Sequence, residues 1–376
     1  MLAAFDCGLR NKQPKSEIRN LLSVIRASGE NDDMSCPINA ILVGCGAMSA
    51  EWLRSASELD VRMVALVDID QRNAEKRCHE FNLAVPIFSD FHQAFRDVPA
   101  DAVFDCTIPA AHKEVSGAAL AVRLHVLEEK PLALTLADAS DLVDLARRAA
   151  RVHTVVQNRR FNRGVRQMRK MVEAGVIGEI TTVHVDFFIG PHFGGFRESM
   201  PHVLLADMAI HPFDAARFLL GVDAEAVFCE EWVPKNSWYQ YGPSVAAIFR
   251  MANDIRFTYR ASWCADGFRT SWDGAWRIIG TEGTIVWDGD DEVKAERVIF
   301  QKGVFLNETE LIRSEEEPPA SEIRGHFSVM HQFVEAVRGG PMPETHSADN
   351  IRSLAMVLAA IQSAETGQWT AVRNDK

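Results

Sequence analysis

Short apolar runs alternate with stretches of helical apolar spacing from Asn39 to about residue 156. Such runs are typical of strands buried on both faces of a parallel sheet, and the stretches between them supply helical crossovers. We therefore expect a doubly wound Rossmann domain with six strands. The pattern locates five of these strands, at Ala40–Val43, Val61–Val67, Ala102–Cys106, Leu124–Leu127 and Val152–Val156, and helices at Met48–Leu59, Arg72–Phe81, from Ser89 or Asp90 to Phe95, His112–Val122 and Thr135–Ala150.

Beyond residue 157 the runs become longer and alternate apolar with polar residues, which is typical of an antiparallel sheet with one covered face. The expected strands are Ile180–Ile189, Ala226–Trp232, Val245–Met251, Ile255–Trp263, Trp272–Ile279 and Thr284–Trp287, and the expected helices are Val165–Ala174, Leu204–Leu220, Ile323–Arg338 and Ala348–Glu365. The fold class is therefore α/β plus α+β: a Rossmann domain at 36–157 and, at 158–376, a domain with a large, mostly antiparallel open sheet.

Residues 1–35 form a separate N-terminal extension. Ser16 to Ser28 has the spacing of one amphipathic helix. Basic residues interrupt the apolar positions, so the stretch does not resemble a secretory signal. We interpret it either as a native extension or, the reading we favour, as the product of an upstream start, with Met34 as the natural beginning.

Composition and charge limit the class of function. The chain has 376 residues, 47% hydrophobic and 24% charged, as in globular enzymes. Its formal net charge of −12 argues against binding to nucleic acid or to an anionic membrane. The seven cysteines stand singly, without metal-ligand spacing, which favours a reducing, cytoplasmic compartment and no metal site.

A glycine loop follows the first strand. Gly44 allows a tight turn, and Gly46 lets the backbone approach a pyrophosphate, together with Ala47 and Met48. Asp68 ends the next strand, where a carboxylate accepts hydrogen bonds from the ribose hydroxyls of NAD and repels a 2′-phosphate. An ordinary strand–helix turn is the alternative, but Asp68 favours a dinucleotide. Nearby Arg72 leaves NADP possible.

Lys130 lies at the carboxyl end of the fifth strand, in the segment Glu128-Glu129-Lys130-Pro131. Ligands bind at this edge of open α/β sheets, and a lysine there can bind a substrate hydroxyl. A surface lysine that merely follows a strand fits the position equally well, so position alone leaves both readings open.

Asp207 and His211 are four residues apart, so they share one face of a helix, and Asp214 lies close to the same face. A carboxylate beside an imidazole can bind a polyol and move its proton. A helix-start aspartate with a buried histidine is the structural alternative. A metal pair would need a third ligand, which the sequence does not suggest.

Taken in order, these motifs resemble those of the Gfo/Idh/MocA oxidoreductases over nearly all of Ile38 to Val372. The resemblance implies a catalytic group of Lys130, Asp207 and His211. It places cofactor contacts and substrate contacts at further positions. The matching pieces are Gly44-Cys45-Gly46, Asp68, Thr107-Ile108-Pro109 with His112, Glu129-Lys130-Pro131, Arg159-Arg160-Phe161, Gly175 to Ile180, Asp207 with His211 and Asp214, Gly280 to Thr284, and the final helix pair; the implied cofactor residues are Gly44, Gly46, Ala47, Met48, Asp68, Arg72, Thr107, Pro109, His112, Glu129 and Lys130, and the implied substrate residues are Asn158, Arg159, His192, Asp207 and His211.

The resemblance implies an NAD(P)-dependent dehydrogenase of a sugar, a cyclitol or a related polyol, in a homodimer or homotetramer formed sheet to sheet. An NAD-dependent glycoside hydrolase and a non-catalytic ligand-sensing regulator are alternatives on the same scaffold. Retention of Lys130 and His211 weighs against the regulator. Two departures stand out: Ser49 replaces the usual third glycine, and Met200 to Leu205 replaces a glycine-rich approach to Asp207. Arg197 and His202 are either local specificity residues or merely polar loop residues, and we favour the second reading.

Overall fold

The computed structural model describes residues 36–290, 292–300, 305–313 and 318–373. The extension and the helix expected at Ser16–Ser28 lie outside the described residues. The chain divides into two units, Met1–Pro37 and Ile38–Lys376, and all elements below belong to the second unit.

The first sheet has six parallel strands in the order β3-β2-β1-β4-β5-β6. Successive strands wind outward in both directions from β1, so a topological switch point lies between β1 and β4, where α/β sheets bind ligands. This confirms the Rossmann prediction. The strands are β1 (Ile38–Val43), β2 (Val61–Val67), β3 (Ile87–Phe88), β4 (Ala102–Asp105), β5 (His125–Glu128) and β6 (His153–Val155), and the helices are α2 (Ser49–Ser57), α3 (Gln71–Phe81), α4 (Phe91–Asp97), α5 (Pro109–Ala121) and α6 (Leu136–Ala149).

Apolar side chains from β1 pack on both faces of this sheet, which explains why its sequence is continuously apolar. Leu42 contributes to one buried cluster and Ile41 to the other. The first cluster includes Phe333 of α9 (His326–Val337), which comes from the far end of the chain. Its ring packs edge-on against Phe104 of β4, with centroids 6.0 Å apart. The final helices therefore complete the core of the first sheet.

The second sheet has nine strands in the order β14-β13-β12-β11-β7-β10-β9-β8-β15. Only β7 and β10 run parallel; the other neighbours with a described register are antiparallel, which confirms the expected mostly antiparallel sheet. The strands are β7 (Ile180–Phe188), β8 (Ala224–Trp232), β9 (Ser244–Met251), β10 (Arg256–Ser262), β11 (Ala275–Gly280), β12 (Gly283–Trp287), β13 (Lys294–Phe300), β14 (Glu308–Arg313) and β15 (Thr370–Ala371).

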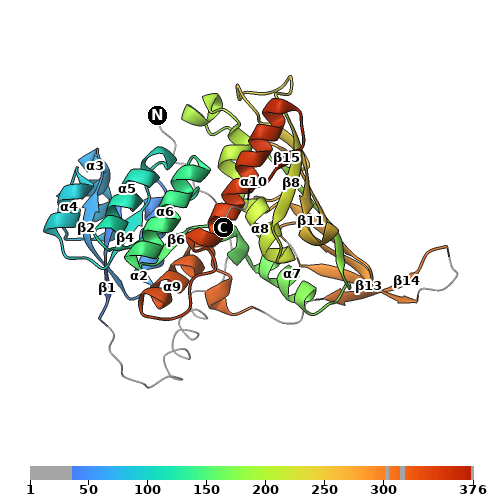
Figure 1. Ribbon diagram of the computed structural model, residues 1–376, viewed down its shortest axis with the longest axis horizontal. Coiled ribbons are helices and arrows are strands. Elements are labelled where there is room, and N and C mark those ends of the chain that lie inside the picture. Colours follow the sequence, from blue (N-terminus) through green and yellow to red (C-terminus); the bar gives the residue numbers. More distant parts are fainter. Residues whose placement is uncertain (1–35, 291, 301–304, 314–317, 374–376) are drawn as a thin grey trace, which may run out of the picture. The chain divides into compact units, whose positions relative to one another are not determined.

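The sequence pattern missed the pair β13 and β14, which lies at one edge of the sheet (Figure 1). Each strand carries three charged residues, and most described side chains of β14 are exposed. Because an edge strand without a buried face carries little apolar signal, the period-two pattern is weak there.

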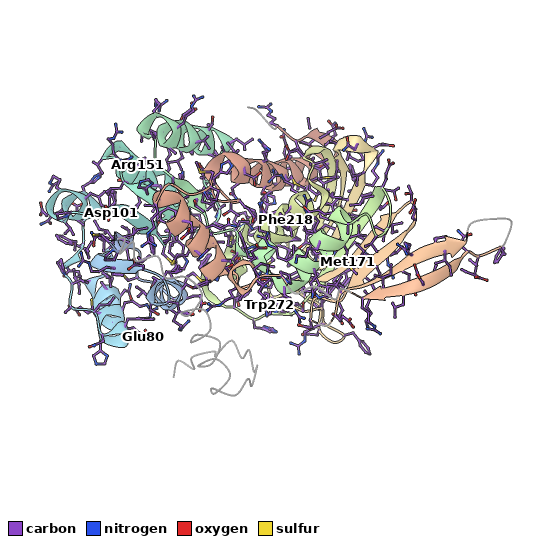
Figure 2. The ribbon with its side chains drawn as sticks, turned by 90° about the horizontal axis from the view of Figure 1, so that it is seen from below. Glu80, Asp101, Arg151, Met171, Phe218 and Trp272 are labelled. Atoms are coloured by element: carbon purple, nitrogen blue, oxygen red, sulfur yellow. The ribbon has the colours of Figure 1, made fainter. Side chains whose placement is uncertain are left out.

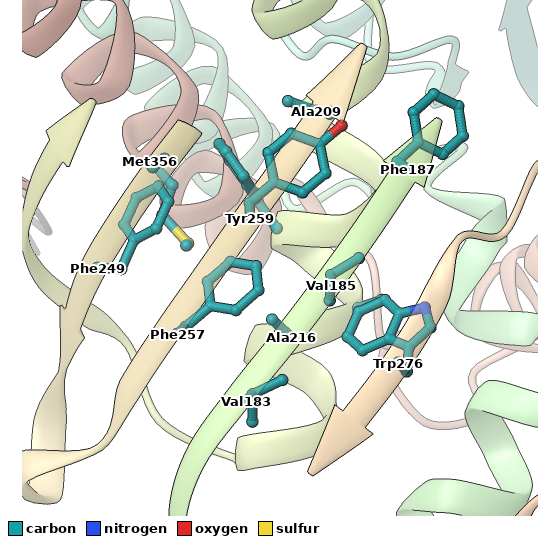
Figure 3. Packing of buried hydrophobic residues seen from close by; sticks show 14 of the residues in the cluster. Val183, Val185, Phe187, Ala209, Ala216, Phe249, Phe257, Tyr259, Trp276 and Met356 are labelled. Carbon is teal, nitrogen blue, oxygen red and sulfur yellow. The ribbon is translucent and has the colours of Figure 1, made fainter. Parts of the chain in front are cut away.

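One face of the second sheet packs against helices α7 (Arg163–Glu173), α8 (Ile210–Leu220) and α10 (Ser347–Thr366). Figure 3 shows Phe249, Phe257 and Tyr259 gathered on this face. Phe213 of α8 packs edge-on against these three rings, at centroid distances of 4.8, 5.9 and 5.3 Å. Each fully buried aromatic side chain stabilises the fold by roughly 2–3 kcal/mol, so this cluster anchors α8, the helix that carries His211.

A buried ionic network fixes the other side of α8. Arg160 donates to both carboxylate oxygens of Asp214, at 2.8 and 2.5 Å, and Ser353 of α10 donates to the same carboxylate at 2.8 Å. Asp349 joins the network from α10, 3.1 Å from Arg160. The guanidinium of Arg160 also lies over the ring of Phe218, labelled in Figure 2. Asp214 therefore has a structural role, holding α8 against α10 and the short helix Asn158–Phe161.

Replacing Asp214 tests this network. Asp214→Ala leaves the Arg160 guanidinium buried without its main partner, so we expect the free energy of unfolding to fall by about 3–5 kcal/mol. Urea unfolding followed by circular dichroism measures the change. Asp141→Ala is the control: its carboxylate pairs with Lys113 at the surface, and such pairs contribute about 1 kcal/mol or less. Equal losses in the two variants would contradict the structural role of Asp214.

Candidate active site

The glycine loop between β1 and α2 leaves a row of backbone donors open. Gly46, Ala47 and Met48 are exposed, and their N–H groups have no acceptor in the described part of the chain. Gly44 has a φ of +89°, and a Cβ there would lie 2.5 Å from the carbonyl oxygen of Cys106. A Cβ on Gly46 would meet no described atom within 4 Å. Open N–H groups at a helix start fit the pyrophosphate of a dinucleotide.

Ser49 takes the place of the third glycine without disturbing this loop. Its hydroxyl is fully buried and donates to the carbonyl oxygen of Gly46 at 2.7 Å. Arg77 of α3 donates from Nε to the Ser49 hydroxyl at 2.9 Å and from Nη2 to the Gly46 carbonyl at 2.7 Å. The serine and the buried arginine therefore brace the loop from the side opposite its open N–H groups.

Asp68 follows β2 and lies against the same loop. One carboxylate oxygen accepts from the Cys45 N–H at 2.8 Å, and the other accepts from the Asp70 N–H at 2.9 Å. Arg72 lies at the surface in a bidentate pair with Asp70, at 2.8 and 2.6 Å, so its charge is already balanced. The carboxylate is therefore oriented at the point where a ribose is bound in this kind of fold.

Lys130 extends from the end of β5 toward the second sheet. Its Nζ donates to the backbone carbonyl of Asp207 at 2.8 Å and to Asp207 Oδ1 at 2.9 Å. Glu129 turns the other way, where its carboxylate accepts from Trp52 Nε1 at 3.1 Å and from the Lys130 N–H at 3.0 Å. The ammonium is thus directed to the helix that carries Asp207 and His211.

Asp207 lies in a π-helical segment, Leu204–Ala209, where the sequence predicted a continuous α-helix. Pro212 follows this segment and has no N–H to donate an α-helical hydrogen bond. Turns of π-helix are frequent at functional sites. Burial would raise the pKa of Asp207, but Lys130 and Arg197 outweigh burial and hold that pKa below its usual range. Nε of Arg197 donates to Asp207 Oδ2 at 2.6 Å, so this residue contacts the site and is not merely a polar loop residue.

His211 begins the first turn of α8 and is buried. Its Nδ1 lies 3.0 Å from the amide Nε2 of Gln157. Burial lowers the pKa of His211 well below its usual 6.5, and the positive charges of Lys130 and Arg159 lower it further. The imidazole is therefore neutral at neutral pH, as a proton acceptor must be.

The expected substrate residues lie in two separate parts of the structure. The Arg159 guanidinium donates to Asp273 at 2.5 Å, and both residues line one small cavity with His211 and with Trp272, labelled in Figure 2. Asn158 lies beside Arg159 and contacts His326 at 3.3 Å. His192, in contrast, is exposed and stacks on Trp238, with ring centroids 3.8 Å apart.

Three expected cofactor residues follow β4, Thr107 in the loop and Pro109 and His112 in α5. Pro109 opens α5 and is exposed. Thr107 donates its hydroxyl to Asp105 at 2.6 Å. His112 is fully buried, and both ring nitrogens face backbone carbonyls, so its immediate partners belong to the protein itself.

A dinucleotide-binding crevice beside an ammonium, a carboxylate and a neutral imidazole defines a nicotinamide-dependent oxidoreductase. Two family models match, "Oxidoreductase family, NAD-binding Rossmann fold" over residues 38–157 and "GFO/IDH/MocA C-terminal domain" over residues 165–286. The chain belongs to the Gfo/Idh/MocA family and carries its NAD-binding domain. No helix in the described ranges has the length and apolar character to cross a membrane.

Known relatives share the whole two-domain arrangement. The 1,5-anhydro-D-fructose reductase of Ensifer adhaerens is 26% identical, over 87% of this chain and 96% of its own. The D-glucoside 3-dehydrogenase of Escherichia coli is 26% identical, over 89% of this chain and 97% of its own. An oxidoreductase from Agrobacterium radiobacter, solved with NAD+, L-tartaric acid and magnesium, superimposes with a TM-score of 0.79 over 89% of this chain and 98% of its own, at 20% identity.

Asp68 predicts a preference for NAD over NADP. We expect the protein to bind NADH at least tenfold more tightly than NADPH, about 1.4 kcal/mol, because the carboxylate repels a 2′-phosphate. Asp68→Ser should reduce this ratio, as measured by titration of nicotinamide fluorescence. Asp90→Ser, which changes a helix cap outside the loop, should leave the ratio unchanged. A wild-type protein that binds both cofactors equally would contradict the role of Asp68.

Proposed function

We propose that the protein is an NAD-dependent dehydrogenase that transfers hydride between nicotinamide and a hydroxyl-bearing carbon of a sugar, cyclitol or related polyol. The observation that carries this proposal is the hydrogen bonding of Lys130 Nζ to Asp207, one turn before His211. The names of the relatives, a reductase and a dehydrogenase of carbohydrates, support the substrate class.

Lys130 stabilises the substrate oxygen in this mechanism. Its ammonium is partly exposed, with 18% of the side chain accessible, so a hydroxyl can approach it. As the hydroxyl loses its proton, negative charge develops on the oxygen, and a fixed ammonium lowers the energy of that state. Asp207 holds the ammonium in place and is itself held ionised by Lys130 and Arg197. Bound nicotinamide supplies the hydride acceptor.

His211 accepts the hydroxyl proton. Its Nδ1 faces Gln157, so Nε2 is the nitrogen that must receive the proton, and a neutral imidazole with a free Nε2 carries its own proton on Nδ1. The Gln157 amide then has to present its oxygen to Nδ1–H, the reverse of the orientation in the structure. The orientation of the Gln157 amide therefore decides which tautomer of His211 is present.

Lys130→Ala tests the assignment. We expect the affinity for NADH to change by less than about threefold. The kcat for oxidation of the polyol should fall at least ~100-fold, because one transition-state interaction is lost. A panel of sugars and inositols with NAD+ and NADP+, followed by nicotinamide absorbance, identifies the substrate first.

Lys113→Ala is the matched control, since Lys113 pairs with Asp138 and Asp141 at the surface of the first domain. It should retain wild-type turnover. A Lys130→Ala enzyme as fast as wild type would show that another group stabilises the reacting oxygen.

The face of the second sheet that no described helix covers supports self-association. Its side chains border a hollow of about 920 Å³, and they carry both signs of charge, including Asp186, Glu230, Arg260 and Arg277. A face with both charges is complementary to itself across a two-fold axis. We propose a homodimer, or a homotetramer built from it, in which two copies pack sheet to sheet.

Ile248 lies on this face and is 44% exposed. In Ile248→Glu, charge repulsion at the shared face should convert the assembly to monomers, as measured by light scattering after size exclusion. Val122→Glu makes the same kind of change at an exposed site on the first domain and should keep the native mass. A monomeric wild-type protein would overturn the proposal.

A further inference from the structure

His112 occupies a position in which a neutral imidazole cannot satisfy its surroundings. The ring is 0% exposed. Its Nδ1 lies 2.8 Å from the carbonyl oxygen of Pro131, and its Nε2 lies 3.2 Å from the carbonyl oxygen of Thr107. A carbonyl oxygen can only accept a hydrogen bond, so both ring nitrogens must donate, and only the imidazolium has two N–H groups.

We propose that His112 is a buried imidazolium that positions Lys130, by clamping the Pro131 carbonyl to the loop that follows β4. His112 is then a positioning residue, which acts on the reaction through Lys130 and touches neither substrate nor cofactor. The inference rests on the catalytic role proposed for Lys130. His112 would be a further charged group that affects the reaction, and it lies entirely inside the first domain.

Two buried carboxyl groups beside the ring, Glu128 and Asp105, supply the opposite charge. Burial raises the pKa of Glu128 well above its usual range, and the charge of His112 lowers it. Glu128 of β5 is fully buried, with Oε1 3.4 Å from His112 Nδ1. That oxygen has no hydrogen-bond partner within the described structure. Asp105 of β4 is also buried, and its carboxylate accepts from Thr107 and from Ser116 of α5. Burial lowers the pKa of His112, but Glu128 and Asp105 outweigh burial and raise it above 6.5.

A second histidine provides an internal comparison. His153 of β6 contacts the other oxygen of Glu128 at 2.8 Å from its Nε2. Its Nδ1 has no partner among the described residues, and burial lowers its pKa to about 4. His153 is therefore neutral, while His112, with two carbonyl acceptors, holds the proton. The two rings share a carboxylate, but only His112 reaches the Lys130–Pro131 turn.

Losing the charge would release this turn. A neutral His112 presents a lone pair to one carbonyl, so either the Thr107 loop or the Pro131 carbonyl has to move away. Because the folded-state pKa is raised, the clamp is intact below pH 6.5 and is lost as the pH rises through that raised value. The Lys130 ammonium would then lose its alignment with Asp207.

Nitrogen NMR of the full-length protein labelled in histidine tests the charge directly, without substrate. His112→Gln identifies the resonances. We expect both ring nitrogens of His112 to be protonated at pH 6, below its raised pKa, whereas His153 shows one bare nitrogen. A bare nitrogen on His112 at pH 6 would overturn the proposal, whatever the enzyme's activity.

Kinetics test the positioning role. Glu128→Gln removes the countercharge, so we expect its kcat to decline at a lower pH than in the wild type. In His112→Gln we expect kcat to fall at least about tenfold, with NADH affinity changing far less. His153→Gln, an equally buried replacement, should retain the wild-type pH profile of kcat.

Should His112→Gln fail to fold, the NMR titration and the Glu128→Gln profile still decide the matter. An unchanged kcat profile in Glu128→Gln, together with full turnover in a folded His112→Gln, would remove His112 from the mechanism. Failure of Lys130→Ala to lose activity would instead remove the proposed role of Lys130, and it would leave the charge of His112 to be decided by NMR.

Discussion

The hydrogen bonds between Lys130 and Asp207 are the contact on which the account depends. They join the carboxyl end of a Rossmann strand to a π-helical turn 77 residues later. Neither sheet alone can assemble the site, since the first supplies the dinucleotide crevice and the ammonium, and the second supports the carboxylate and the imidazole. The packing of α9 on the first sheet and of α10 on the second holds the two halves of this contact in place.

The surrounding charges lower the free-energy cost of burying the Lys130–Asp207 ion pair. An isolated buried charge costs several kcal/mol, and the buried charges of Asp207 and Arg160 both have partners. Asp207 lies between Lys130 and Arg197, and Arg160 is paired with Asp214. Burial and the positive charges of Lys130 and Arg159 keep His211 neutral. The same principle gives opposite protonation states to two histidines that share Glu128.

Much of the fold follows from residue patterns, and the exceptions have physical causes. The strands of the first sheet are apolar because both faces of the sheet are covered. Only Ile87–Phe88 was not predicted in this sheet, because two residues are too few to give a pattern. The strand Lys294–Phe300 and the edge strand Glu308–Arg313 beside it carry too few alternating apolar residues to give a period-two pattern. The π-helical turn before Ile210 leaves no signal in the apolar spacing, although Pro212 marks an irregularity there.

The site was only partly accessible from the sequence. The order of motifs grouped Lys130 with Asp207 and His211, and the structure brings them together. Arg197 was misread as a polar loop residue, because it lies outside any motif. Gln157 was missed, because its contact with His211 is distant in sequence. His112 belonged to a matching motif, yet its two carbonyl partners become visible only in three dimensions.

The most direct test is a structure of the protein with NADH and the polyol identified by the substrate panel. The account predicts one substrate hydroxyl oxygen within hydrogen-bonding distance of both Lys130 Nζ and His211 Nε2, on a carbon that faces the nicotinamide ring. A reacting hydroxyl held by other residues, with Lys130 still bound only to Asp207, would contradict it.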